Sequence, residues 1–303
     1  MLVNLWDTLE TILVGTLEEG FAYAIMALGI YITYRILDFP DLSVDGTFPL
    51  GGAVTAILIV SGVNPVATLF ISFLVGALAG MITGLIHVKL KVRDLFAGII
   101  MMTALYSINL RIAGRANLPF FMQDTIFRND IIKKLFPPIL QDYQIAIISL
   151  VIVIIMKLLL DFYLNTKSGY LLRAAGDNDT LVTSLAKDKG VVKIIGLSIA
   201  NAFVALSGSV YAQKVGYFEI SSGTGTITIG LASVIIGINL FKRNTWLKTT
   251  TAVIIGAVLY KLCVAIAIFI GLNPSDLKLI MASLFLFILV ISKDRKRKVK
   301  SNA

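Results

Sequence analysis

The chain has 303 residues, of which 57% are hydrophobic and only 15% are charged, and its mean hydropathy is +0.88. Soluble domains carry about 25% charged residues, so this composition argues against a soluble domain and indicates a protein that spans a lipid bilayer. The net charge of +9 is expected to lie mostly in cytoplasmic loops rather than to bind nucleic acid. With one cysteine and one histidine, we expect no disulfide framework, no metal, no cofactor and no catalytic residue.

Apolar runs recur along the whole chain, each near the ~20 residues that cross the hydrocarbon layer as a helix. The acidic first stretch, residues 1–19, predicts a separate amphipathic helix on the membrane surface. The expected fold is all-α, a single polytopic transmembrane bundle over residues 1–303 with about eight or nine spans. The predicted spans are residues 20–36, 47–63, 65–88, 95–113, 143–164, 191–211, 226–241, 249–271 and 277–292.

The distribution of Lys and Arg predicts the orientation of these spans. The basic tail, residues 293–300, is expected in the cytoplasm, and counting back through the spans places the N-terminus outside. Most of the remaining Lys and Arg residues then fall on the cytoplasmic side. Residues 114–142 become a long outer connection with a short helix, and residues 165–190 become a polar cytoplasmic loop.

A short motif occurs twice and predicts an internal duplication. Ser43-x-x-Gly46-Thr47 returns as Ser222-x-x-Gly225-Thr226. Upstream of each copy, the pattern Ala-x-x-Ala-Leu begins at Ala24 and again at Ala202. In the predicted orientation the two copies lie in spans that run in opposite directions, so they favour antiparallel halves at about 20–113 and 191–292, as in many transporters.

The composition of the motif indicates whether its two copies lie beside a translocation path. Glycine beside Ser and Thr permits a broken helix, which is tolerated at membrane depth only against protein or a water-filled cavity. Both copies are therefore predicted to approach a translocation path, with close helix packing as the alternative. Packing is the preferred interpretation for a stripe of glycines at positions 76, 80 and 84. The candidate pathway residues are Ser43, Asp45, Gly46, Thr47, Ser222, Gly223, Thr224, Gly225, Thr226 and Lys261.

Lys261 stands near the middle of a predicted span, where a lysine costs roughly 2.5–3.5 kcal/mol on insertion scales. We expect it to face the interior of the bundle and to meet backbone carbonyls or an acid such as Glu219 or Asp45. Snorkelling of the ammonium group toward an interface is the alternative.

The cytoplasmic loop carries the clearest family signature. Its run from Gly169 to Asn178 resembles the coupling segment of permeases of branched-chain amino acid and ribose ABC importers, in which Gly-Arg-x-x-Arg-Ala-x-Gly-Asp/Glu-Asn contacts the ATPase. Tyr170 replaces the usual arginine, and the following stretch to residue 190 is longer than usual. Asp177 or Asn178 is expected to cap a helix over residues 180–187. The resemblance implies ATPase coupling by Gly169, Arg173, Ala174, Gly176, Asp177 and Asn178.

The resemblance extends to other parts of the chain. Residues 41–46 (Asp-Leu-Ser-Val-Asp-Gly) resemble the Asn-Leu-Ser-x-Gly break near the start of the core of those permeases, and residues 223–237 are similar to the glycine-rich span of their second half. Residues 93–95 and 104–110 resemble the branch that works with lipoprotein binding proteins for tryptophan, tyrosine and related ligands.

The resemblance implies a transport subunit of the cell membrane rather than an enzyme. Its expected partners are a second permease copy, preferably identical, a dimer of cytoplasmic ATPases and an extracytoplasmic binding lipoprotein, and its expected cargo is a small solute, best an amino acid and possibly aromatic. The sequence contains no Gly-x-x-x-x-Gly-Lys-Ser/Thr loop for ATP phosphates. An ion-coupled secondary transporter with inverted repeats is the alternative.

Overall fold

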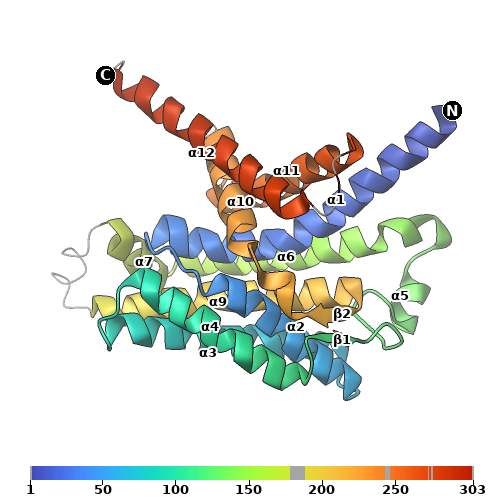
Figure 1. The fold of residues 1–303 in the computed structure, drawn as a ribbon, viewed down its shortest axis with the longest axis horizontal. Helices are drawn as coiled ribbons and strands as arrows, with labels where there is room; N and C mark the ends of the chain where they lie inside the picture. The colour runs from blue at the N-terminus through green and yellow to red at the C-terminus, as the bar shows by residue number, and fades with distance from the viewer. Residues whose placement is uncertain (1, 178–187, 243–245, 272, 274–275, 302–303) are drawn as a thin grey trace.

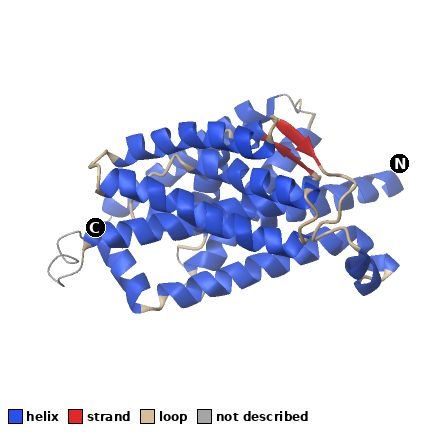
Figure 2. Cartoon of the chain, turned by 90° about the horizontal axis from the view of Figure 1, so that it is seen from below, coloured by secondary structure: helices blue, strands red, loops and turns tan. Residues whose placement is uncertain are grey.

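The computed structural model describes residues 2–177, 188–242, 246–271, 273 and 276–301, and this part is helical almost throughout (Figures 1 and 2). In chain order, its helices are α1 Leu2–Ile30, α2 Val44–Val60, α3 Pro65–Val88, α4 Asp94–Ala113, α5 Asp130–Leu135, α6 Gln144–Leu164, α7 Lys167–Asp177, α9 Lys189–Val215, α10 Thr226–Leu240, α11 Thr249–Phe269 and α12 Leu277–Ser301. A π-helical turn, η1 (Tyr31–Ile36), extends α1, and the 3-10 helices are η2 (Pro138–Tyr143) and η3 (Ile220–Gly223). The strands are β1 (Asn117–Pro119) and β2 (Tyr217–Glu219).

Within the described residues, 7 helical segments are long and apolar enough to cross a membrane, and α2 and the apolar part of α12 are shorter apolar helices. Each predicted span coincides with one of these segments, so the expected all-α polytopic bundle is confirmed. The predicted surface helix over residues 1–19 is wrong as a separate element. The helix instead continues without a break from Leu2 into η1, and its apolar span already begins at Glu10.

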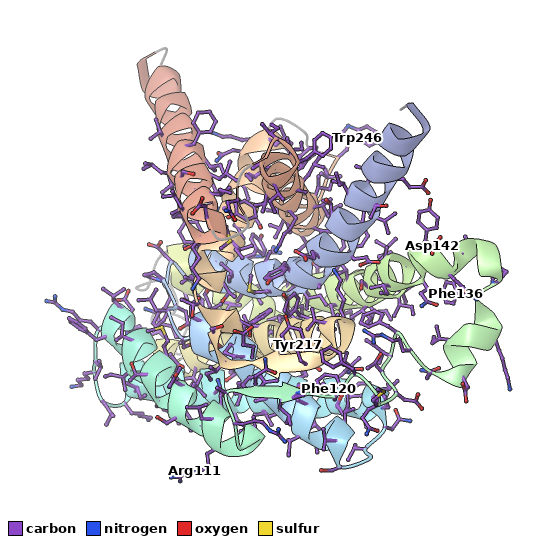
Figure 3. All side chains as sticks on the ribbon, turned by 45° about the vertical axis from the view of Figure 1, so that its right-hand side comes forward. Arg111, Phe120, Phe136, Asp142, Tyr217 and Trp246 are labelled. Atoms are coloured by element: carbon purple, nitrogen blue, oxygen red, sulfur yellow. The ribbon has the colours of Figure 1, made fainter. Side chains whose placement is uncertain are left out.

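The two ends of the bundle differ in structure. Helix α7 lies at one end, while β1, β2 and α5 lie at the other (Figure 1). The strands pair antiparallel with Leu118 opposite Phe218, and the Phe120 backbone N–H donates to Gly216 O over 2.8 Å. Figure 3 labels Phe120 and Tyr217 at this ribbon, which joins the end of α4 to the end of α9. The short helix expected in residues 114–142 is present as α5, whereas the strand pairing was not predicted.

Helices α1 and α9 form the centre of the bundle. Helix α9 packs against α1, α2 and α3, and α1 packs against α9, α10 and α11. Likewise α2 contacts α3 and α4, as α10 contacts α11 and α12. The same contacts therefore recur when α1–α4 are exchanged for α9–α12 in order.

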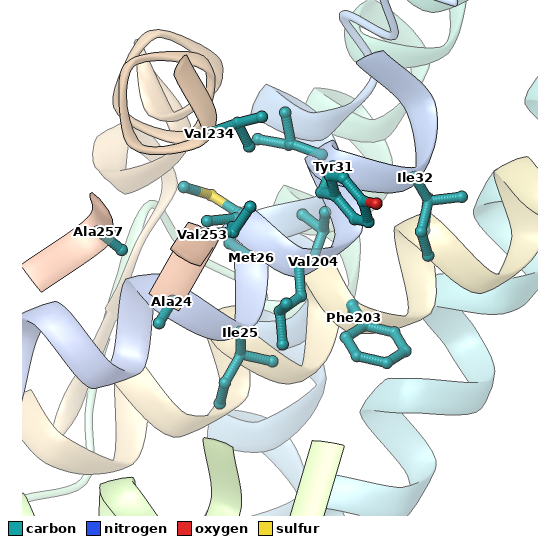
Figure 4. Close-up of a cluster of buried hydrophobic side chains, with 14 of the residues drawn as sticks. Ala24, Ile25, Met26, Tyr31, Ile32, Phe203, Val204, Val234, Val253 and Ala257 are labelled. Carbon is teal, nitrogen blue, oxygen red and sulfur yellow. The ribbon is translucent and has the colours of Figure 1, made fainter. Parts of the chain in front are cut away.

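The core between the central helices combines aliphatic side chains with aromatic rings such as Tyr31 and Phe203. Ile25 and Met26 of α1 meet Val204 of α9 and Val253 of α11, and all four are fully buried (Figure 4). Along α3, the glycine stripe faces α9 so closely that a Cβ at Gly80 would overlap the Leu197 carbonyl oxygen. Inside a membrane the hydrophobic effect does not drive helices together, and small residues instead allow their backbones to pack closely. The packing interpretation of this stripe is confirmed.

Candidate functional site at the junction of the two motif copies

The two motif copies each mark the start of a short helix. Ser43 is the N-cap of α2, and Gly225 is the N-cap of α10, with a φ of 85° in the left-handed region that favours glycine. With 17 and 15 residues, the helices are about 26 and 23 Å long, shorter than the roughly 30 Å hydrocarbon layer. The irregular backbone that the motif predicts therefore lies just before these helices, not inside them.

Asp45 of the first copy caps the helix of the second copy. Its Oδ1 accepts hydrogen bonds from Thr226 Oγ1 at 2.9 Å and from the Ile227 backbone N–H at 2.8 Å, and its Oδ2 accepts from the Gly225 N–H at 3.0 Å. A carboxylate at a helix N-terminus satisfies unpaired amides and complements the positive end of the helix dipole. The halves meet so closely here that a Cβ on Gly223 would overlap the Asp45 carbonyl oxygen.

A second polar cluster fixes the connection between η1 and α2. The Ser43 N–H donates to Asp41 Oδ1 at 2.9 Å, Asn201 Nδ2 of α9 donates to Asp41 Oδ2 at 2.7 Å, and Ser43 Oγ donates to Asn201 Oδ1 at 3.2 Å. All three side chains are buried. Burial raises the pKa of the Asp41 carboxyl group above its ordinary value, while the hydrogen bonds from Ser43 and Asn201 oppose this rise.

The predicted pathway residues lie in several different environments. Ser43, Thr47 and Thr226 are buried, and the Thr47 and Thr226 hydroxyls donate to Ser43 O at 3.0 Å and to Asp45 Oδ1 at 2.9 Å. Asp45, Gly46 and Thr224 line a cavity of about 430 Å³ between α2, α4 and η3. Ser222 lines a separate cavity of about 80 Å³.

Sequence reasoning missed the contribution of α4 to the larger cavity. The lining also contains Thr103, Tyr106, Ser107 and Asn109. Asn109 is fully buried, and its Nδ2 donates to Gly46 O at 3.0 Å. The signal was available as a cluster of polar residues at helical spacing within an otherwise apolar span.

Lys261 lies away from this junction. Its Nζ is 3.0 Å from Glu19 Oε2 and 3.8 Å from the centre of the Tyr23 ring, and its side chain is 12% exposed. Lys261 thus meets an acid inside the bundle, as expected, but this acid is Glu19 and not the predicted Glu219 or Asp45. Glu19 was missed because residues 1–19 were assigned to a surface helix.

The surroundings of Lys261 form a second charged site. Lys214 lies 3.3 Å from Glu18 and 3.9 Å from Glu19 in its ion pairs. Lys261, Lys214 and Glu19 line a cavity of about 480 Å³ between α1, α9 and α11. We call these four residues the α1 ion cluster: Glu18, Glu19, Lys214 and Lys261.

The predicted coupling segment is largely a helix, α7, rather than the expected loop. Leu172 and Ala175 are buried, because they recur at helical spacing and pack onto the bundle. Gly169 and Gly176 also face the bundle: added Cβ atoms would overlap the carbonyl oxygens of Tyr163 and Ile36 respectively. Of the other candidates, Arg173 is exposed, Ala174 is half-buried and Asp177 ends the helix. Asn178 and the helix expected over 180–187 lie outside the described residues.

Comparison with known proteins places these features in a family. A family model described as the permease component of the branched-chain amino acid transport system matches residues 12–291. A tyrosine transport system permease protein from Clostridioides difficile is 40% identical over 291 residues, covering 96% of this chain and 95% of that protein. Uncharacterized protein RP368 from Rickettsia prowazekii is 35% identical over 94% of this chain and 99% of its own length. Among solved structures, PsaBC from Streptococcus pneumoniae in complex with Fab has a similar fold, with a TM-score of 0.55, 14% identity, and coverage of 99% of this chain and 100% of that chain.

Proposed function

Because the chain belongs to the family of branched-chain amino acid transport system permeases, we propose that it carries an amino acid into the cell. Membership makes it the membrane-spanning subunit of an ATP-driven importer, a multi-pass protein of the cell membrane and not an enzyme. The proposed cargo is an aromatic amino acid, which the name of the C. difficile relative supports. The proposed partners are an ATPase dimer, an extracytoplasmic binding protein and a second copy of this chain.

The observation that carries this proposal is the polar face of α4 beside the motif junction. Thr103, Tyr106 and Ser107 are exposed, although they belong to a helix long and apolar enough to cross the membrane. A cluster of polar side chains at membrane depth is more stable against water or protein than against lipid. We therefore place the translocation path along this face, where the cavity lined by Asp45 and Thr224 opens, and we expect a second copy to close it.

Coupling to the ATPase is proposed to run through α7. The exposed side chains of Tyr170 and Arg173 are available to an ATPase, while the buried side of the helix rests on η1 through Gly176 and Ile36. The chain continues from η1 through Asp41 to Asp45, whose carboxylate holds the start of α10. A displacement of α7 would thus reach both motif copies through contiguous packed elements. In this proposal ATP hydrolysis by the partner ATPase drives the displacement of α7. Family membership favours this mechanism over an ion-coupled secondary transporter.

Replacing an exposed α7 cation tests the coupling proposal. Arg173→Glu should abolish most uptake of radiolabelled tyrosine, tryptophan or leucine in vesicles that contain this chain with its ATPase and binding protein, because the charge at the docking face is reversed. The matched control is Lys89→Glu, which reverses an exposed cation after α3 and should transport normally. Equal uptake by both variants would refute the assignment of α7. ATP-independent uptake by the unaltered protein would refute the ATP-driven mechanism itself.

A further inference from the structure

The cavity between α2, α4 and η3 contains a buried hydrogen-bond acceptor without a partner. Asn109 lines this cavity and is fully buried, and its Oδ1 has no hydrogen-bond partner in the described part of the chain. Its amide orientation is fixed, because Nδ2 donates to Gly46 O at 3.0 Å and a flipped amide would set two oxygens against each other. An unpaired buried acceptor is costly, so this oxygen is suited to receive a donor from a ligand.

The charge of the cavity favours a cationic ligand. Among its lining residues Asp45 is the one that carries a charge. The amides of Gly225 and Ile227 at the start of α10 are already taken by the Asp45 carboxylate, so this helix end is not free to hold an anion. The positive end of a helix dipole amounts to roughly half a charge, which leaves the Asp45 side of the cavity net negative.

The rest of the lining suits an organic solute rather than a bare ion. Pro49, Met102 and Ile220 supply apolar surface, and Tyr106 supplies an aromatic ring. The volume of about 430 Å³ lies within the roughly 300–1,000 Å³ typical of small-molecule sites.

We propose that this cavity is a binding site for the ammonium end of the transported amino acid. The ammonium group donates to Asn109 Oδ1, Asp45 provides the complementary charge, and the side chain of the solute lies against Met102 and Tyr106. This assignment rests on the proposed function and adds to it which end of the solute the chain recognises. It also predicts that an amine without a carboxylate binds, whereas a carboxylate without an amine does not.

Cysteine protection tests this recognition on the full-length chain. Thr103→Cys is placed in a Cys263→Ala background, which removes the native cysteine, and labelling by a water-soluble maleimide is timed in nanodiscs. In the described part of the chain the Thr103 hydroxyl donates to Ile99 O of its own helix at 2.9 Å, so the substitution should be mild. L-Tyrosine and tyramine should slow labelling, while 3-(4-hydroxyphenyl)propionate should not.

Two variants of Asn109 assign the effect to its acceptor. Asn109→Leu should weaken protection by tyramine about tenfold or more, since a hydrogen bond to a charged group is lost. Asn109→Asp loses the hydrogen bond to Gly46 O, as Asn109→Leu does, but keeps an acceptor oxygen. Protection by tyramine that is retained in Asn109→Asp and lost in Asn109→Leu therefore separates recognition by the acceptor from the loss of that structural bond. Protection by the propionate equal to that by tyramine would overturn the inference.

The ammonium site and the proposed transport function can be refuted independently of each other. Uptake of tyrosine by the complete transporter, together with unchanged labelling in the presence of every ligand, would reject the ammonium site while leaving the transport role intact. Protection by tyramine without any ATP-dependent amino acid uptake would support the site and reject the proposed function.

Discussion

Asp45 and the α1 ion cluster hold acidic groups within membrane helices in opposite ways. Asp45 has no ion pair within the described residues and is stabilised by two backbone N–H groups and one hydroxyl at the start of α10. Glu19 instead has two cations, Lys261 at 3.0 Å and Lys214 at 3.9 Å. The start of α10 depends on the single carboxylate of Asp45, whereas Glu19 keeps one cation if the other is removed. Loss of one group should therefore be costlier at the motif junction.

The largest effect is expected for Asp45→Ala. The substitution leaves the N–H groups of Gly225 and Ile227 without their acceptor inside the bundle, so the free energy of unfolding should fall by about 3 kcal/mol. Thermal unfolding of the purified protein in detergent measures the loss. Asp94→Ala is the matched control, because Asp94 also lies in the first turn of a helix but accepts from the Leu95 N–H in an exposed setting. A similar loss in both variants would contradict a special role for Asp45.

An intermediate effect is expected for Lys261→Met. Glu19 is 43% exposed and retains Lys214, so the loss should be about 1 kcal/mol, comprising the ion pair and the cation–π contact with Tyr23. Glu19→Gln and the double variant complete a thermodynamic cycle in the same unfolding assay. We expect the two substitutions to be less than additive, because they remove the same pair. Strict additivity would show that the pair contributes nothing.

The smallest effect is expected for Asp41, and it depends on pH. A raised pKa means that the fold favours the protonated carboxyl group, so its contribution is complete below the ordinary aspartate pKa of about 3.9 and is lost as pH rises through the folded pKa. Asp41→Asn mimics the protonated group and removes this dependence. The difference in melting temperature between the unaltered protein and the variant should therefore shift in favour of the variant as pH rises. A constant difference would contradict a raised pKa.

The sequence predicted the helices well because the features that define a membrane span lie within the span itself. A span must satisfy its backbone by itself and remain apolar over about 20 residues, and both features can be read without knowing the neighbours. The repeated motif was equally readable, and both copies do begin helices that meet at Asp45. The limits of α1 and α7 were less readable, because the acidic residues within 1–19 and the polar residues within 165–190 resemble the ends of spans until their packing is known.

Composition, spacing and resemblance by themselves determined an all-helical membrane protein, its spans, its repeated motif and its family. Only the tertiary structure decided that Lys261 pairs with Glu19, that β1 pairs with β2, and that Asn109 lines the cavity at Asp45. These contacts join residues far apart in the chain, and which helix faces meet depends on close backbone approach at residues such as Gly80 and Gly223. Local patterns identify such residues but do not specify the partner against which they pack.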